Sequence, residues 1–207
     1  MLRALRFSGS WPGLPDRELT MARLASVVVI SGILFILAAP AGAQFPRTVF
    51  LEELTWTEVR DAIQDGATTA IIPTAGTEQN GPHMVLGKHR FIIEHAADLV
   101  ARRLGNTVVA PVVTYVPEGD VDPPSGHMRY AGTITLPNEF FVKLVEYAAR
   151  SLAAHGFTDI VLIGDSSGNQ RGMEEVATTL NAEWSGTSSE LGTEDRRRNC
   201  WWIGRTC

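Results

Sequence analysis

Three apolar runs alternate with stretches of helical periodicity, and this alternation constrains the fold more than any other feature of the chain. The runs cover residues 68–72, 107–116 and 159–163 and are rich in Ile and Val. Such continuous runs are typical of strands that are buried on both faces of a parallel sheet. Because strands joined by helices form right-handed βαβ units, the pattern predicts an α/β protein with three layers, α/β/α, around a mainly parallel sheet.

The helices are predicted from apolar spacing and from residues that begin or end helices. Thr55 or Thr57 can cap the first helix, Gly105 follows the end of the second, and Pro137 suits the first turn of the third. Pro111 lies inside the second apolar run, which indicates an edge strand, a bulge or a strand start there. The predicted helices cover about residues 55–64, 90–104, 137–155 and 171–183.

The N-terminal part of the chain has the pattern of a secretory signal peptide. Arg23 precedes an apolar run that ends in small residues at Ala43. We therefore expect an exported protein, periplasmic or secreted, that begins at Gln44 and has no stable membrane insertion after cleavage; an uncleaved anchor is the alternative. The expected organisation is an upstream extension over residues 1–20, a signal peptide over 21–43, one domain over 44–184 and an irregular tail over 185–207.

The composition of the chain argues against some classes of function and limits how the C-terminal residues 185–207 can be interpreted. A net charge of -5 over 207 residues argues against a nucleic-acid partner. Both cysteines, Cys200 and Cys207, lie in the tail and lack the spacing of a metal site. The tail is first small and polar, then charged, without periodicity, which indicates either disorder or a reading frame that departs from its proper ending.

The candidate site is a loop over residues 74–89, directly after the first apolar run. It carries Glu78, His83 and His89, together with amide side chains and Lys88. Open α/β sheets bind their ligands at the carboxyl ends of the strands, so this loop is well placed for a site. Lys88 is either a contact for an anion or a solvated lysine. The alternative to a functional site is that the whole loop is a polar surface turn.

Two further loops are expected to meet this one. The turn over residues 164–169 follows the third apolar run and therefore lies at the same edge of the sheet, with Asp165 and Ser166. The long loop over residues 117–133 can fold over both and carries His127, which is either a site residue or an exposed turn histidine.

The turn at Ser166 also matches G-x-S-x-G, the sequence of a nucleophile elbow. Its strand-before, helix-after context is correct for a serine hydrolase. In that fold, however, the catalytic histidine follows the serine in the chain, and no histidine occurs after His155. A serine hydrolase is therefore only a distant alternative.

Three motifs resemble those of the creatininase (creatinine amidohydrolase) family. Residues 77–83, Thr-Glu-Gln-Asn-Gly-Pro-His, resemble its Glu-Gln-His-Gly-Pro-His motif, residues 132–136 resemble Pro-Gly-Thr-Ile-Ser-Leu, and residues 164–169 resemble Asn-Gly-His-Gly-Gly-Asn. The motifs come in family order within about residues 49–184. The family's later His-Ala-Gly-Glu segment has no match, so the resemblance implies a divergent member shortened at its C-terminal side.

This resemblance implies a layered α/β/α, creatininase-like fold, often assembled as a hexamer. It also implies a metal-dependent hydrolase of small cyclic or linear amides, usually with two divalent ions such as zinc or manganese. A metal-activated water would attack the amide carbonyl. A non-catalytic or truncated protein with the same fold and no turnover is the alternative.

Carried over residue by residue, the resemblance implies a changed ligand set. Glu78 matches the family's first carboxylate ligand. Asn80 and Ser166 stand where the family has histidine ligands, and His89 stands where it has an aspartate. His89 can still bind a metal through a neutral ring nitrogen.

The resulting expectation is a metal site of Glu78, His89 and Asp165, in which the carboxylate of Asp165 substitutes for its neighbour in the chain. His83 and His127 are the candidate catalytic histidines. The expected partners are a small-molecule amide substrate and other copies of the chain.

Overall fold

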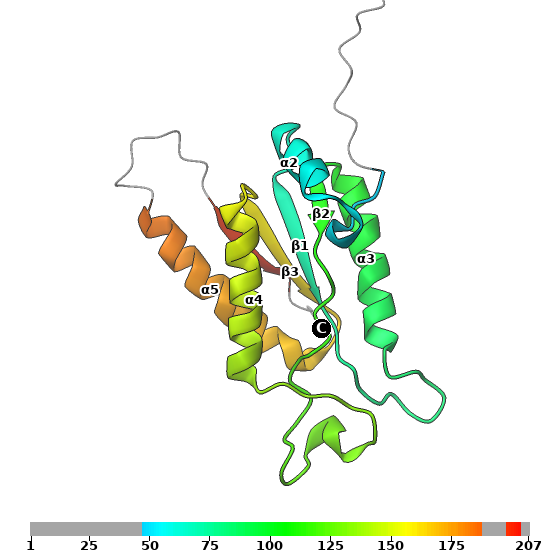
Figure 1. Cartoon of the computed structure of the whole chain (residues 1–207). Coiled ribbons are helices and arrows are strands. Elements are labelled where there is room, and N and C mark those ends of the chain that lie inside the picture. The colour runs from blue at the N-terminus through cyan, green and yellow to red at the C-terminus, as the bar shows by residue number, and fades with distance from the viewer. Residues whose placement is uncertain (1–46, 188–197, 204–207) are drawn as a thin grey trace, which may run out of the picture. The chain divides into compact units, whose positions relative to one another are not determined.

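The computed structural model describes residues 47–187 and 198–203, which form one four-stranded sheet with helices on both faces (Figure 1). All strand pairs are parallel, in the order β2-β1-β3-β4. The expected upstream extension and signal peptide lie outside the described residues. None of the helices within the described ranges is long and apolar enough to cross a membrane. The strands are β1 (Thr69–Thr74), β2 (Thr107–Val109), β3 (Asp159–Gly164) and β4 (Asn199–Ile203).

The predicted three-layer α/β/α arrangement is confirmed. Helix α3 (Lys88–Leu104) covers one face and buries Ala97 and Ala101 against Ile71 and Val109 of the sheet. The other face carries the larger core, which includes Phe141 and residues of β1, β2 and β3. Figure 1 shows α4 and α5 running side by side over this face. The helices of that layer are α2 (Trp56–Gln64), α4 (Asn138–Ala154) and α5 (Gln170–Thr187).

The helix boundaries follow from local chemistry and agree with the prediction to within a few residues. Thr55 caps α2 in a reciprocal capping box, since its hydroxyl accepts from the Glu58 amide and the Glu58 carboxylate accepts from the Thr55 amide. Gly105 ends α3 in the left-handed conformation, at a φ of 78°. Pro137 is the residue that precedes α4.

The second apolar run forms a much shorter strand than expected. Regular pairing in β2 stops at Val109, and Pro111 has no amide hydrogen to continue it. The chain nevertheless stays beside β1, because Ala110 donates to the Ile71 carbonyl and Val113 donates to the Pro73 carbonyl. This segment therefore leads residues 114–118 to the carboxyl edge of the sheet.

The strand order places the candidate loops together. β1 and β3 are neighbours in register, and their last paired residues are Thr74 and Gly164. β2 lies on the other side of β1, and the helices that follow β1 and β2 cover opposite faces. This is the topological switch point at which α/β sheets bind ligands. The loops after β1 and β3 therefore start side by side, as the sequence predicts.

The expectation of an irregular tail from residue 185 is wrong for two segments. Helix α5 continues to Thr187, and Asn199–Ile203 pair with β3 as the edge strand β4. The Asn181 side chain accepts from the Cys200 amide at 2.8 Å and donates to the Cys200 carbonyl at 2.7 Å, while Cys200 itself is buried. A strand of five residues beside a charged stretch is too short to show a period. Residues 188–197 and 204–207 lie outside the described part of the chain.

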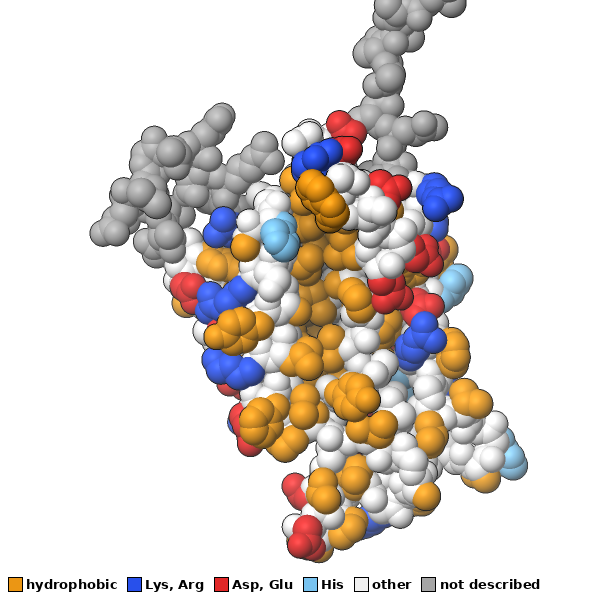
Figure 2. All heavy atoms as spheres, in the orientation of Figure 1, with side chains coloured by type: hydrophobic (Ala, Val, Ile, Leu, Met, Phe, Trp, Pro, Cys, Tyr) orange, Lys and Arg blue, Asp and Glu red, His pale blue; other side chains and the backbone are white. Residues whose placement is uncertain are grey.

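Helix α4 has an exposed apolar row at helical spacing. Phe140, Leu144 and Tyr147 are 58%, 41% and 65% exposed. Figure 2 shows hydrophobic side chains gathered on this side of the molecule. Exposed apolar patches often belong to protein interfaces. The expected homo-oligomer, hexameric by resemblance, stays a prediction.

We predict that Asn181→Ala loosens β4. The substitution removes both side-chain hydrogen bonds to Cys200, and the unfolding free energy should fall by about 1–3 kcal/mol in urea titrations. Thr179→Ala, an exposed change on the same helix, is the matched control and should cost well under about 1 kcal/mol. Equal losses for the two variants would contradict the docked position of β4.

Candidate active site

Three loops enclose a cavity of about 510 Å³ at the carboxyl edge of the sheet. The loop after β1 and the first turn of α3 contribute Glu78, Asn80, Lys88 and His89. The long loop contributes residues 117–119, 126 and 127, and the turn after β3 contributes residues 165–168. The long loop folds over the other two, as predicted, and Thr77 and Ile134 form a β-bridge that holds it there. The cavity therefore combines side chains that lie far apart in the sequence.

Glu78 lies at the centre of the charged cluster and is 5% exposed. Its Oε1 is 2.7 Å from His89 Nε2, and its Oε2 is 3.3 Å from His127 Nε2. Glu118, which is also buried, completes the cluster. One ligand atom each from Glu78, Glu118 and His127 lie within 4.8 Å of one another.

Both imidazoles present their Nε2 atoms to Glu78 while Nδ1 is occupied elsewhere. His127 Nδ1 lies 3.2 Å from the Gln79 carbonyl, which can only accept, so Nδ1 carries the hydrogen. His89 Nδ1 lies 2.7 Å from the Asp165 carboxylate, which favours the same tautomer. In the neutral rings both Nε2 lone pairs therefore face carboxylate oxygens. That contact is repulsive unless a cation or a proton lies between the atoms.

Backbone contacts fix Glu118 and His127 relative to each other. The His127 amide donates to the Glu118 carbonyl at 2.9 Å. The Thr135 hydroxyl accepts from the Glu118 amide at 3.0 Å and donates to the Gly119 carbonyl at 2.9 Å. The two candidate ligands of the long loop are thus held as one unit.

The carboxyl groups of Glu78 and Glu118 differ in pKa because of their burial and their contacts. Burial, and then the contact with Glu78, raise the pKa of Glu118 to about 9. Burial also opposes ionisation of Glu78. A hydrogen bond from Glu118, and the attraction of His127 and His89 when their Nε2 atoms carry a proton, outweigh burial and hold the pKa of Glu78 below its usual range. In the metal-free protein at neutral pH, Glu118 is therefore protonated and Glu78 is ionised.

Several buried polar atoms at this site lack a hydrogen-bond partner. They are Glu118 Oε1, Asp165 Oδ1 and, in the tautomer whose proton is on Nδ1, His89 Nε2. Buried polar atoms are rarely left unpaired, because each costs free energy comparable to a lost hydrogen bond. Their concentration in one cavity indicates that a group outside the polypeptide completes the site.

Asn80 and Lys88 form a separate contact in the same cavity. Lys88 Nζ donates to Asn80 Oδ1 at 2.7 Å, and Asn80 Nδ2 donates to the Glu78 carbonyl at 3.2 Å. The Asn80 oxygen is therefore already engaged by an ammonium group.

The structure brings together most of the residues that the sequence singles out. Glu78, His89, Asp165 and His127 all line the cavity. His83 does not: it is exposed, because the chain reverses at Gly81, whose φ is 87°, and directs the following residues to solvent. Its expected catalytic role has no geometric support.

Ser166 lines the cavity but lacks a catalytic partner. It is 6% exposed, and no histidine of the described residues hydrogen-bonds its hydroxyl. The serine-hydrolase alternative therefore has no general base.

Glu118 is the site residue that the sequence reasoning missed. It lies two residues after the second apolar run and therefore obeys the same carboxyl-edge rule as Glu78. The carboxyl-edge rule, applied to the second apolar run as well as to the first and third, predicts Glu118 as a site residue.

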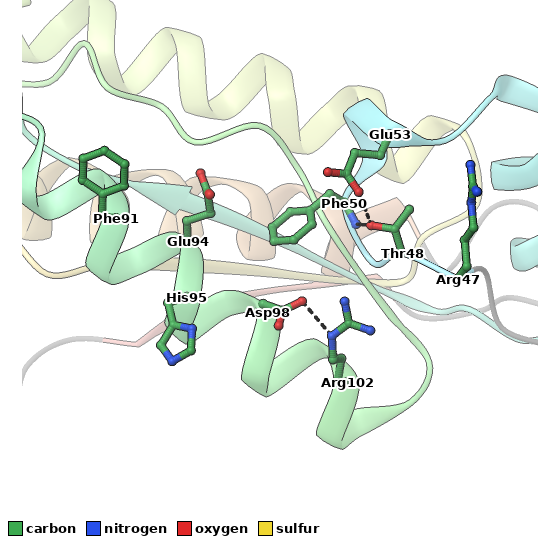
Figure 3. A pocket seen from close by; sticks show the side chains of 9 residues that line it. All are labelled: Arg47, Thr48, Phe50, Glu53, Phe91, Glu94, His95, Asp98 and Arg102. Carbon is green, nitrogen blue, oxygen red and sulfur yellow. Dashed lines mark hydrogen bonds and ion pairs between the residues drawn. The ribbon is translucent and has the colours of Figure 1, made fainter.

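A second hollow of about 460 Å³ lies between α3 and the segment before α2 (Figure 3). Two of its three acids are paired with arginines, Glu94 with Arg90 at 2.6 Å and Asp98 with Arg102 at 2.8 Å. The third, Glu53, accepts from the Thr48 hydroxyl. In Figure 3, Glu94 and His95 point in different directions. This hollow therefore lacks the convergent ligand atoms of the first cavity.

The raised pKa of Glu118 predicts a pH-dependent stability for the metal-free protein. Above the ordinary glutamate pKa of about 4.5 the unfolded chain ionises while the native Glu118 stays protonated, so stability falls as pH rises toward about 9. Glu118→Gln should therefore match the wild type near pH 5 and exceed its unfolding free energy by at least about 1 kcal/mol at pH 8.

Denaturant titrations with a chelator at the two pH values measure this difference. Glu174→Gln, at an exposed position on α5, is the control and should show no such pH dependence. A Glu118→Gln advantage that is the same at both pH values would contradict the assigned protonation.

A comparison with known proteins identifies related sequences. The family model described as "Creatininase: Creatinine amidohydrolase" matches residues 52–204. A creatinine amidohydrolase from Pseudomonas putida is 28% identical over 117 residues, which are 56% of this chain and 44% of the relative. A 3-dehydro-scyllo-inosose hydrolase from Thermotoga maritima is 25% identical over 57% of this chain and 36% of the relative. A mycofactocin precursor peptide peptidase from Mycobacterium tuberculosis is 29% identical over 55% of this chain and 46% of the relative.

Solved structures share the fold. A crystal structure of creatinine amidohydrolase (creatininase) superposes with a TM-score of 0.65 at 23% identity, over 76% of this chain and 58% of the other. Similar structures include a mutant creatininase described as Zn-Zn type and one described as creatininase Mn. The chain spans less than half the length of the curated relatives it matches.

Proposed function

This chain belongs to the creatininase family, and from that premise we propose that it is a metal-dependent hydrolase of a C–N bond in a small cyclic or linear amide. The main observation behind this proposal is that the Nε2 atoms of two imidazoles face the two oxygens of Glu78, with Glu118 beside them. The unpartnered buried atoms of the same cavity support the proposal.

The donor set fits a divalent cation such as zinc or manganese. Carboxylate oxygens and neutral imidazole nitrogens are the ligands that these ions take in hydrolases. Glu78, Glu118 and His127 are the residues that would hold the ion, with His89 on the other oxygen of Glu78. Asp165 holds the proton at His89 Nδ1 and so keeps Nε2 available, as carboxylates do behind metal-bound histidines.

This ligand set differs from the family pattern that the sequence resembles. Asn80 is engaged by Lys88, and Ser166 is a poor ligand. In our proposal, Glu118 and His127 of the long loop supply the donors that these two positions lack. His127 then serves as a ligand, in place of the catalytic role expected from the sequence.

The residues divide the chemistry among them. When bound, the divalent ion lowers the pKa of a water molecule and polarises the amide carbonyl. Glu78 and Glu118 contribute the negative charge that binds the ion, since Glu118 releases its proton on binding. His127, whose side chain is 40% exposed, forms the solvent side of the cluster. A small amide therefore approaches past His127.

We expect stoichiometric zinc or manganese in the purified full-length chain. His127→Gln and Glu118→Gln should each weaken metal binding at least about tenfold, because each removes one donor. His83→Gln is the matched control, since His83 lies on the first loop outside the cavity. Elemental analysis and competition with a chelator measure the metal content, and release of amine from a panel of small amides measures turnover.

The outcome separates the two functional hypotheses. Folded protein without metal would support the non-catalytic alternative. An effect of His83→Gln as large as that of His127→Gln would place the site elsewhere.

Gly76→Ala should disturb the same site without removing a ligand. A Cβ at residue 76 would overlap Glu118 Oε1 and approach Glu78 Cδ to 3.3 Å. Metal affinity should fall at least about tenfold as Glu118 moves away. Gly87→Ala is the control, because its Cβ meets only the Phe91 ring at 3.8 Å. Equal metal affinities for the two variants would contradict the position assigned to Glu118.

A further inference from the structure

Lys88 is a cation without an acidic partner inside the candidate active site. It lines the same cavity as Glu78, Glu118 and His127. The one hydrogen bond of its side chain goes to the neutral Asn80 side chain, and no acid of residues 47–187 or 198–203 pairs with its ammonium group. The neighbouring carboxylates are engaged instead with histidines, Glu78 with His127 and His89, and Asp165 with His89.

Asn80 holds Lys88 in one orientation. Its Nδ2 donates to the Glu78 carbonyl, so its Oδ1 must point the other way, where it accepts one hydrogen from Lys88 Nζ. An ammonium group has three hydrogens, so two remain available to a ligand. A half-buried ammonium gains more from an anionic acceptor than from a neutral one.

The backbone adds to the positive potential at this point. Lys88 is the first residue of α3, whose first turn carries no acidic residue and whose preceding residue, Gly87, provides no side-chain cap. The positive end of the helix dipole therefore reinforces the lysine charge. The rest of the cavity wall, with Glu78, Glu118 and Asp165, would repel an anion. An anionic group thus has one favourable position in the cavity, beside Lys88.

We propose that the substrate is an amide that also carries a carboxylate, of the N-acylated amino acid class, and that Lys88 Nζ binds this carboxylate. The inference rests on the proposed hydrolase function. In this arrangement the carboxylate fixes one end of the substrate at the start of α3. The amide then extends toward Glu78, Glu118 and His127. Asn80 is a positioning residue, since it acts through Lys88.

The test compares two probes that differ in charge and little in size, N-acetylglycine and N-acetylglycinamide. Their dissociation constants are measured by calorimetry on the full chain, both loaded with zinc and metal-free, with the metal content of each sample determined. The wild type should bind the acid at least about tenfold tighter than the amide. Lys88→Met should reduce this preference to within about twofold, and Lys88→Arg should keep part of it.

Lys143→Met is the matched control, because Lys143 is the chain's other lysine and lies exposed on α4. It should keep the full preference for the acid. A preference that survives in Lys88→Met would show that the carboxylate binds elsewhere and would overturn the inference. The inference would also be overturned if the wild-type protein showed no preference for the acid, or if it bound neither probe.

The two proposals fail separately in this experiment. Metal-loaded protein without a charge preference would leave the hydrolase proposal standing and remove the role of Lys88. A Lys88-dependent preference in protein that binds no metal would keep the carboxylate site and contradict the metal-dependent hydrolase.

Discussion

The site depends on one buried carboxylate. Glu78 lies just beyond the carboxyl end of β1, and its two oxygens face imidazoles from two different segments, His89 of α3 and His127 of the long loop. A charge in this position is stable only if it is compensated, because burial strongly disfavours the ionised form. Helix α3 and the long loop bring the two imidazoles to Glu78, and the turn after β3 brings Asp165 to His89. The parallel sheet provides the switch point at which these segments meet.

The same requirement explains why the cavity carries both paired and unpaired groups. Protein contacts fix the direction of both imidazoles, since Asp165 orients His89 and the Gln79 carbonyl orients His127. A proton or a bound cation can then compensate the charge of Glu78, and the proposed metal ion would do so beside Glu78, Glu118 and His127. Lys88 lines the same cavity and donates to Asn80. In our proposal the cavity therefore offers a cation site and an anion site, and the two together would orient a charged substrate.

Much of the fold could be predicted from the sequence, because the helices and central strands carry strong local patterns. Thr55, Gly105 and Pro137 mark helix ends through chemistry that acts within a few residues. β4 was missed, because a five-residue edge strand is specified by contacts with α5, such as that of Asn181 with Cys200, and not by a period of its own.

The site was predictable where position follows from topology and unpredictable where it follows from side-chain direction. Glu78 and Asp165 follow paired strands, so the sheet brings them together. His83 belongs to the same motif as Glu78, but the turn at Gly81 points it to solvent, and a motif does not encode that direction. Glu118 reaches the cluster because residues 110–113 follow β1 without forming a regular strand. Because Glu118 comes just after the second apolar run, the carboxyl-edge rule could still have predicted it.

The central claim is that Glu78, Glu118 and His127 together form a metal centre. Anomalous diffraction at the zinc edge, from crystals of the full chain grown with zinc, tests it most directly. The account predicts a strong peak bonded to one atom each of Glu78, Glu118 and His127, at about 2.0–2.2 Å. No peak at this cluster, or a peak held by Asp165 and Ser166 without Glu118, would contradict it.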